Sequence, residues 1–317
     1  KIAITVPASA VPRSGNRHTA ARWASFLSAL GHRVRIVTEW RGGDDDLLLA
    51  LHARKSFDSI RRFSGLRPDS PLIVALTGTD LYRDLRTSAE ARQSLGMAAR
   101  LIVLQEEGLR ELSAFLRRKT GIVYQSSDVK LRHAPDRSRF RIAVIGHLRS
   151  EKDPYRAVQA LYRIERAAPV EVLQIGAALD PEMRSRCRSW MKREPRYRWL
   201  GSVTHARAMR WLSTSHVLVV SSVMEGGANV ICEAARIGVP VLASRVPGNV
   251  GMLGRGYPGY FPLFDDKALA RLIERCRTDA SFYKRLKVAL LRRRALFAPD
   301  AERAALKRLL RNLPAGE

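Results

Sequence analysis

The hydrophobic residues of this chain fall into short apolar runs that alternate with stretches of helical periodicity. Runs of four to six apolar residues predict buried parallel strands. They lie at 1–6, 34–37, 46–52, 72–76, 101–104 and 121–124, and again at 140–145, 170–175 and 216–220. Between the first two runs, residues 17–30 place Trp23, Phe26 and Leu27 on one face, which predicts a helix. The alternation predicts parallel sheets with helices on both faces.

The second half of the chain is richer in predicted helices. They cover 206–213, 230–237, 267–276, 281–296 and 301–313. Pro299 interrupts the chain before the last of them, and Asp300 is the predicted N-cap. The polar segment 132–139, which contains Pro135, separates two groups of strands and is the predicted linker. A chain of 317 residues can form two domains with separate cores. We predict them at 1–136, with the final helix 300–317 added to it, and at 137–299.

One stretch, 221–233, combines a strand end, a glycine turn and a helix start. Gly226 and Gly227 allow a ligand to approach the backbone closely, and the first amides of the following helix carry the positive end of its dipole. Such a turn suits a phosphate or a cluster of hydroxyls. Glu225 and Glu233 bracket it, and eight helical residues rise about 12 Å, close to the length of a nucleotide sugar. The alternative is an N-cap carboxylate and a solvated helix carboxylate.

Glu225 and Glu233 form a Glu-x7-Glu motif that resembles the retaining GT-B glycosyltransferases of the family-4 type. The segments 239–244 and 247–249 are similar to those that follow the motif in that family. Four shorter motifs, at 14–17, 77–82, 146–154 and 224–229, resemble the selenosugar synthases of selenoneine biosynthesis. The resemblance implies an α/β fold of the GT-B type, in which two doubly wound Rossmann-like domains face each other across a cleft. The N-terminal domain would present the acceptor, and the C-terminal domain would bind a UDP-sugar.

The resemblance also implies a donor site for a UDP-sugar, with UDP-N-acetylglucosamine as the expected donor. Lys152 and Arg149 would hold the diphosphate, Glu225 the sugar and Glu233 the ribose. Further donor contacts are implied for Gly15, Asn16, Gly226, Gly227, Ala228, Asn229 and Val230. Lys152, Arg149 and Glu225 are the candidate catalytic residues, because a fixed cation stabilises the charge of the departing diphosphate. The chain departs from the wider family at His147, where an Arg is usual, and the two cations could instead be solvated loop charges.

The acceptor implied by the resemblance is selenophosphate, whose selenium would attack C1 of the sugar. The candidate acceptor-binding residues are Arg17, Thr77, Gly78, Thr79 and Asp80. An ionised selenium nucleophile needs no strong general base, and His18, His52 and Asp80 are candidates for one by position only. The product would be a selenosugar for selenoneine biosynthesis. The sequence predicts neither a cofactor nor a metal site: no dinucleotide fingerprint follows the first strand, and the three cysteines are far apart.

The chain carries a net charge of +26, and 46 of its 56 basic residues are Arg. The charge is spread along the sequence without a helix-turn-helix, RNA-recognition or zinc-finger pattern, so no specific nucleic-acid partner is predicted. A basic cleft for anionic substrates accounts for part of the charge, and contact with an anionic membrane would account for it equally well. No apolar run approaches the roughly 20 residues of a membrane span, and no signal peptide is visible. We therefore expect a cytoplasmic protein.

Three other functions remain open from the sequence. The same fold could transfer a sugar to an oxygen acceptor, including a lipid-linked one at a membrane. It could also epimerise a UDP-sugar. A basic nucleic-acid-binding protein is the alternative from another class, and its duplex binding would be strongly salt-dependent.

Overall fold

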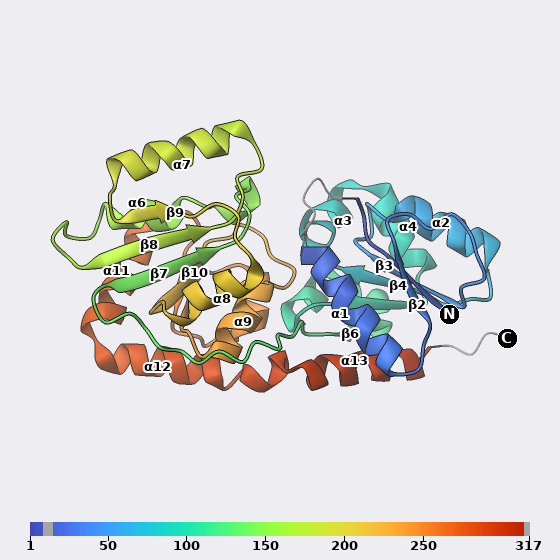
Figure 1. Cartoon of the computed structure of the whole chain (residues 1–317). Helices are drawn as coiled ribbons and strands as arrows, with labels where there is room; N and C mark the ends of the chain where they lie inside the picture. The colour runs from blue at the N-terminus through green and yellow to red at the C-terminus, as the bar shows by residue number, and fades with distance from the viewer. Residues whose placement is uncertain (9–14, 314–317) are drawn as a thin grey trace. The chain divides into compact units, whose positions relative to one another are not determined.

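The structure is a computed structural model that describes residues 1–8 and 15–313. It contains two compact units (Figure 1). The first consists of Lys1–Ser126, Glu225–Gly227 and Pro299–Glu317, and the second of Ser127–Met224 and Ala228–Ala298. The units divide between Ser126 and Ser127, earlier than the boundary that we predicted after residue 136. The residues between these two positions lie in the irregular segment before the first strand of the second unit. Ser14, part of one predicted motif, lies outside the described residues.

The sheet of the first unit has the strand order β2-β1-β3-β4-β5-β6, and every pair is parallel. Its strands are β1 (Ile2–Thr5), β2 (Val34–Val37), β3 (Leu47–Leu51), β4 (Leu72–Leu76), β5 (Arg100–Val103) and β6 (Thr120–Ile122). All residues of β3 and β4 are buried. Helices on both faces of a parallel sheet leave its central strands no solvated side, which explains their uninterrupted apolar sequence.

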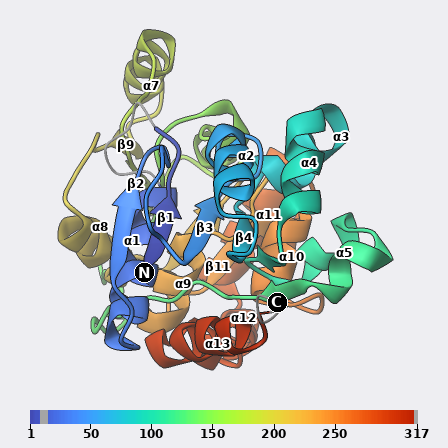
Figure 2. The same cartoon turned by 90° about the vertical axis from the view of Figure 1, so that its right-hand side faces the viewer.

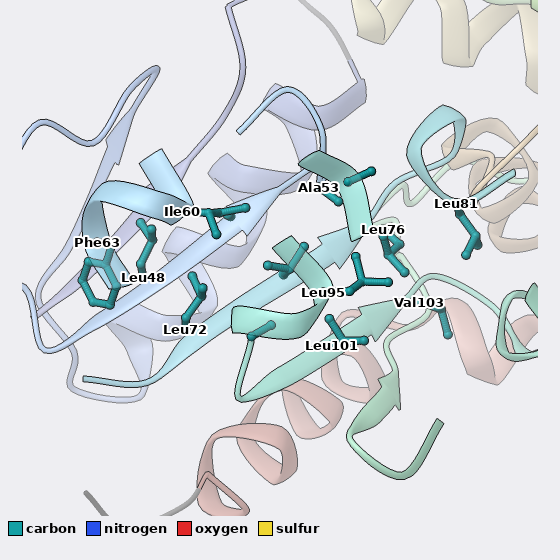
Figure 3. Close-up of a cluster of buried hydrophobic side chains, with 14 of the residues drawn as sticks. Leu48, Ala53, Ile60, Phe63, Leu72, Leu76, Leu81, Leu95, Leu101 and Val103 are labelled. Carbon is teal, nitrogen blue, oxygen red and sulfur yellow. The ribbon is translucent and has the colours of Figure 1, made fainter. Parts of the chain in front are cut away.

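Helices cover both faces of this sheet (Figures 1 and 2). They are α1 (Gly15–Ala29), α2 (Phe57–Leu66), α3 (Leu85–Thr87), α4 (Ala89–Met97), α5 (Ala114–Arg118) and α13 (Pro299–Arg311), with shorter turns η1 (Asp80–Asp84) and η2 (Glu106–Glu111). Trp23 of α1 and Leu306 of α13 belong to the core on one face. Phe63 of α2 and Leu95 of α4 belong to the core on the other face (Figure 3).

A buried carboxylate holds α13 against the first unit. Glu302 is 1% exposed and accepts hydrogen bonds from Arg22 Nε (2.7 Å), Trp23 Nε1 (2.6 Å) and the amide of Ser126 (2.8 Å). A charge removed from water requires such partners. The last helix of the chain is therefore part of the first unit, although about 170 residues of sequence separate it from Ser126.

The second unit contains another parallel sheet, in the order β12-β11-β10-β7-β8-β9. Its strands are β7 (Phe140–Ile145), β8 (Val170–Ile175), β9 (Tyr197–Trp199), β10 (Val217–Val220), β11 (Val241–Ser244) and β12 (Tyr260–Phe261). Its helices are α6 (Arg156–Leu161), α7 (Pro181–Arg193), α8 (His205–Ser213), α9 (Asn229–Ile237), α10 (Pro247–Leu253), α11 (Asp266–Thr278) and α12 (Ala280–Leu291), with the turns η3 (Ser150–Lys152) and η4 (Arg294–Phe297). Helix α6 packs on α11, and α8 packs on α9.

The predicted strands are present with small shifts at their ends, but some helices differ. The predicted helix 281–296 ends at Leu291 and a separate turn, η4, follows it. Pro299 does not precede the last helix but begins it, so Asp300 lies in its first turn and is not the N-cap. Helix α7 was not predicted because Cys187 is its one buried residue, which leaves no apolar stripe in the sequence. Helices α2, α4 and α10 were also missed.

Among the described residues, no helix combines the length and the apolar composition that crossing a bilayer requires.

Candidate functional site

In each sheet, successive strands are added on one side of the first strand up to a certain strand, and the next strand is then added on its other side. We call the gap between these two groups of strands the switch point of the sheet. In the first unit this point lies between β1 and β3, and in the second unit it lies between β7 and β10. Ligands of doubly wound sheets bind outside the carboxyl ends of the strands at such a point. The loops that follow these four strands carry most of the residues that the sequence singled out.

In the second unit, the turn with Lys152 is attached to the loop after β10. The Ser221 hydroxyl donates to the carbonyl oxygens of Lys152 (3.0 Å) and Asp153 (2.8 Å), and the amide of Val223 donates to Glu151 O (2.8 Å). Asp153 adopts a left-handed conformation (φ 41°) and its carboxylate accepts from Arg156 Nε (2.8 Å). The backbone of this turn is therefore fixed by its neighbours, and the half-buried Lys152 projects from a defined position.

The segment before this turn is joined to the end of β8. The amide of Leu148 donates to Ala177 O (2.9 Å), and His147 Nδ1 accepts from the amide of Ala177 (3.2 Å). A Cβ on Gly176 would lie 1.9 Å from Gly146 O, so only glycine fits there. His147 thus helps to shape the loop. Arg149, the other candidate cation, is exposed at the start of η3.

Helix α9 begins at Asn229, as the sequence predicted to within one residue, with Ala228 as its N-cap. No acidic residue lies in its first turn, and Asn229 and Val230 are half-buried. The helix ends at Gly238, whose φ of 96° is left-handed and favours glycine. The dipole end predicted to face the donor is therefore not neutralised by a carboxylate of its own first turn.

Glu233, one turn into α9, is paired with a residue that the sequence analysis missed. His205 Nε2 lies 2.7 Å from Glu233 Oε1, and the side chains are 57% and 14% exposed. The hydrogen bond to Glu233 raises the pKa of His205 above its usual value. His205 is the first residue of α8, and packing of α8 on α9 brings the two together. The sequence around His205, a single histidine at the start of a helix, does not indicate that it pairs with Glu233.

The residues Glu225–Gly227 belong to the compact first unit, although they follow β10 in sequence. Glu225 is 7% exposed. A Cβ on Gly226 would lie 2.2 Å from Thr77 O, and one on Gly227 would lie 2.8 Å from Leu104 Cβ. The two adjacent glycines are therefore required by close packing of this loop.

In the first unit, Gly15, Asn16 and Arg17 form the first turn of α1 after β1. The Thr19 hydroxyl donates to Gly15 O (3.0 Å) and accepts from Gln125 Nε2 (2.5 Å). Gly15 and Arg17 are exposed and Asn16 is half-buried. The described part of the predicted 14–17 motif thus lies at the β1 side of the first switch point.

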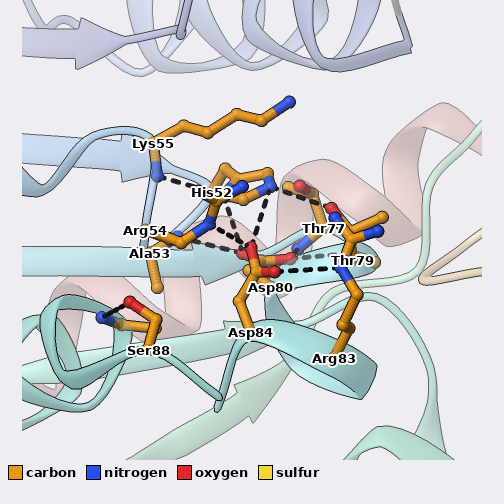
Figure 4. Close-up of polar contacts among 12 residues, drawn as sticks. His52, Ala53, Arg54, Lys55, Thr77, Thr79, Asp80, Arg83, Asp84 and Ser88 are labelled. Atoms are coloured by element: carbon orange, nitrogen blue, oxygen red, sulfur yellow. Dashed lines mark hydrogen bonds and ion pairs between the residues drawn. The ribbon is translucent and has the colours of Figure 1, made fainter. Parts of the chain in front are cut away.

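The predicted acceptor segment, Thr77 to Asp80, follows β4. Asp80 is 0% exposed, and its carboxylate accepts from the amides of Ala53 (3.0 Å), Thr77 (2.9 Å) and Gly78 (2.8 Å) (Figure 4). Thr79 is half-buried. Asp80 consequently links the loop after β3 to the loop after β4. Its carboxylate oxygens are occupied by hydrogen bonds from backbone amides.

The three candidate bases differ in their surroundings. His52 is 3% exposed, and burial lowers its pKa, so the ring is neutral near pH 7. Its Nδ1 accepts from the amide of Lys55 (3.3 Å), and its Nε2 lies 3.0 Å from Thr79 Oγ1. Both ring nitrogens of His52 and both oxygens of Asp80 are therefore engaged. His18 is exposed on α1.

Comparison with known proteins supports the prediction of a glycosyltransferase. Residues 139–279 match the family model described as glycosyl transferases group 1. HepE of Anabaena, solved with UDP and glucose, is 16% identical with a TM-score of 0.75, over 98% of this chain and 99% of that chain. Sucrose-phosphate synthase of Thermosynechococcus elongatus is 19% identical with a TM-score of 0.76, over 98% of both chains. A glycosyltransferase of Rickettsia africae is 13% identical with a TM-score of 0.74, over 98% of both chains.

At these identities the solved structures establish the fold. The prediction of a GT-B fold with two doubly wound α/β units is confirmed, because each unit has a parallel six-stranded sheet with flanking helices.

Proposed function

We propose that this protein is a glycosyltransferase that joins a UDP-sugar to selenophosphate. The main support for UDP-sugar as the donor is found at the switch point of the second unit. There, hydrogen bonds from Ser221 and Val223 hold the Lys152 turn against the loop after β10. The match of residues 139–279 to group 1 glycosyltransferases supports the same reaction class. HepE, which shares the fold, has been solved with UDP and with UDP-glucose.

In this proposal the donor residues act together. Lys152, with Arg149, binds the diphosphate, and Glu233 accepts hydrogen bonds from the ribose hydroxyls. Glu225 and the amides of 226–230 hold the sugar, and Gly15 and Asn16 are further donor-binding residues. A cation beside the leaving oxygen stabilises the negative charge that grows as the bond to C1 breaks. No metal is needed in this scheme, which stays a prediction.

The acceptor part of the proposal rests on the sequence motifs at 14–17, 77–82, 146–154 and 224–229. The selenium of selenophosphate forms a bond to C1, and the C1–O bond breaks with its electron pair leaving on UDP. Water then hydrolyses the Se–P bond, which yields the selenosugar and phosphate. Arg17 and the 77–80 segment would contact the acceptor, with Asp80 acting through the backbone that it fixes.

The test is incubation of the protein with UDP-N-acetylglucosamine and selenophosphate, followed by mass spectrometry for a product with the selenium isotope pattern and by assay of UDP. We expect both products in equal amounts. A C–O product with an added alcohol, but no selenium product, would instead establish an oxygen acceptor. Conversion of the UDP-sugar to its epimer without any acceptor would establish an epimerase. The acceptor assay should be repeated with other UDP-sugars, because the motifs do not fix the sugar.

A further inference from the structure

The loop after β3 carries a lysine that the sequence motifs did not assign. Lys55 lies beside the first switch point, and its loop is fixed to the predicted acceptor segment by Asp80. We propose that Lys55 and Thr79, with His52 as a positioning residue, form an anion site that binds the phosphate group of the acceptor. This inference rests on the proposed function for the identity of the acceptor, but the site itself can be tested without catalysis.

The carboxylates near Lys55 are already satisfied by other partners. Asp80 accepts from three backbone amides. Asp84 is paired with Arg54 Nε (2.8 Å) and Arg83 Nε (3.1 Å). Within the described residues, the Lys55 ammonium makes no hydrogen bond or ion pair, and its side chain is exposed. Among the described residues, the Lys55 ammonium therefore has no carboxylate partner of its own.

His52 determines what the Thr79 hydroxyl can offer to a ligand. Because His52 Nδ1 accepts from the amide of Lys55, the proton of the neutral ring is on Nε2. The Nε2–H group then donates to Thr79 Oγ1 at 3.0 Å. A hydroxyl that accepts this bond still has its own proton to donate, and Thr79 is only half-buried.

His52 is also held in an unusual backbone conformation, with φ of 76°. A left-handed histidine is uncommon and such strain gathers at functional positions. Figure 4 shows the Lys55 side chain running past the His52 ring and away from Asp80 and Asp84. An ammonium and a hydroxyl donor suit the oxygens of a phosphate-type anion.

The first experiment measures the binding of inorganic phosphate by calorimetry. We expect Lys55→Ala to weaken binding about tenfold or more, because hydrogen bonds to charged groups are lost. Lys55→Arg should retain part of the affinity. Lys307→Ala is the matched control: Lys307 is exposed on α13 and its loss removes the same charge from the first unit. If Lys55→Ala and Lys307→Ala have equal effects, the inferred site does not exist.

The Thr79 contribution is tested by Thr79→Val, which keeps the shape but removes the hydroxyl, and Thr79→Ser, which keeps it. We expect several-fold weaker phosphate binding for the first variant and near-normal binding for the second. In the wild type, phosphate should shift the imidazole 15N resonance of His52 Nε2, and Thr79→Val should abolish that shift. A phosphate-bound protein with an unchanged His52 resonance would overturn the role of His52.

Kinetics then connect the site to the acceptor. For Lys55→Ala we expect the KM for selenophosphate to rise about tenfold, while the Kd for UDP stays within about twofold of the wild type. If the variant loses UDP affinity as strongly as selenophosphate affinity, Lys55 binds the diphosphate of the donor, and the inference is overturned. If the wild type forms no selenium product but the phosphate results hold, the proposed acceptor is wrong and the anion site stands.

Discussion

Asp80 and Glu233 are carboxylates that follow the carboxyl ends of strands in the two sheets, but their partners differ sharply. Asp80 is fully buried and accepts from three backbone amides. Glu233 is half-buried, and among the described residues its one partner is the exposed His205. A carboxylate has about four acceptor positions, so Glu233 keeps acceptor capacity for a ligand. The same residue chemistry thus builds a loop in one unit and remains available for binding in the other.

The largest effect is expected for Asp80, which is fully buried and accepts three amide hydrogen bonds. Asp80→Ala leaves three amides near the core without an acceptor, which should lower the free energy of unfolding of the first unit by about 3 kcal/mol or more. Hydrogen exchange of β3 and β4 under increasing denaturant measures this loss. Asp80→Asn keeps an acceptor oxygen and should lose less. If Asp80→Ala is as stable as the wild type, the three hydrogen bonds do not hold the loops.

The next effect concerns the Lys152 turn of the second unit, which the Ser221 hydroxyl holds to the loop after β10. Lys152→Ala should reduce turnover by on the order of 10²-fold, because it removes charge stabilisation that is strongest as UDP departs. Stability should hardly change, since Lys152 is only half-buried. Steady-state kinetics with each substrate varied in turn give the measurement, and Lys192→Ala on the exposed face of α7 is the control. Loss of donor affinity alone, with full turnover at saturation, would reduce Lys152 to a binding residue.

Glu233→Ala tests whether the spare acceptor capacity of Glu233 is used to bind UDP. It should weaken UDP binding by on the order of 1–3 kcal/mol, because ribose hydroxyls lose an acceptor, and it should leave the unfolding free energy nearly unchanged. Calorimetry with UDP alone measures the first effect. Glu165→Ala, an exposed carboxylate just before β8 at the other edge of the sheet, should bind UDP normally. Normal UDP affinity in the Glu233 variant would leave it as a partner of His205 only.

The smallest effect is the pH dependence of the His205–Glu233 pair. Because Glu233 raises the pKa of His205, the pair stabilises the fold fully below the unfolded pKa of 6.5, and this contribution is lost as pH rises through the folded pKa. His205 is 57% exposed, so solvent screening should keep it below about 1 kcal/mol. The stability difference between wild type and His205→Gln at pH 5.5 and pH 8.5 measures it. A larger difference at pH 8.5 than at pH 5.5 would contradict the expected direction.

The contrast between Asp80 and Glu233 also shows what could be predicted about the site. Local sequence placed Asp80 after a strand and Glu233 on a helix, and both placements are correct. It did not reveal their partners, because Ala53, which shares Asp80, and His205, which pairs with Glu233, are more than twenty-five residues away in sequence. The sequence analysis did not single out Lys55, for a related reason. Nothing in its own loop shows that the neighbouring carboxylates are satisfied by Arg54, Arg83 and backbone amides.

The sequence by itself determined most of the strands, though not β9, β11 or β12, and the parallel α/β class. The reason is that a strand buried on both faces must be apolar throughout and that a turn must carry glycine where no side chain fits. It also placed the glycine turn before α9 and the loops at the strand ends. Only the tertiary structure decided the strand order, and with it the two switch points. It also decided that α13 belongs to the first unit through the buried Glu302. These features depend on contacts between distant segments, whose energies no local pattern of residues encodes.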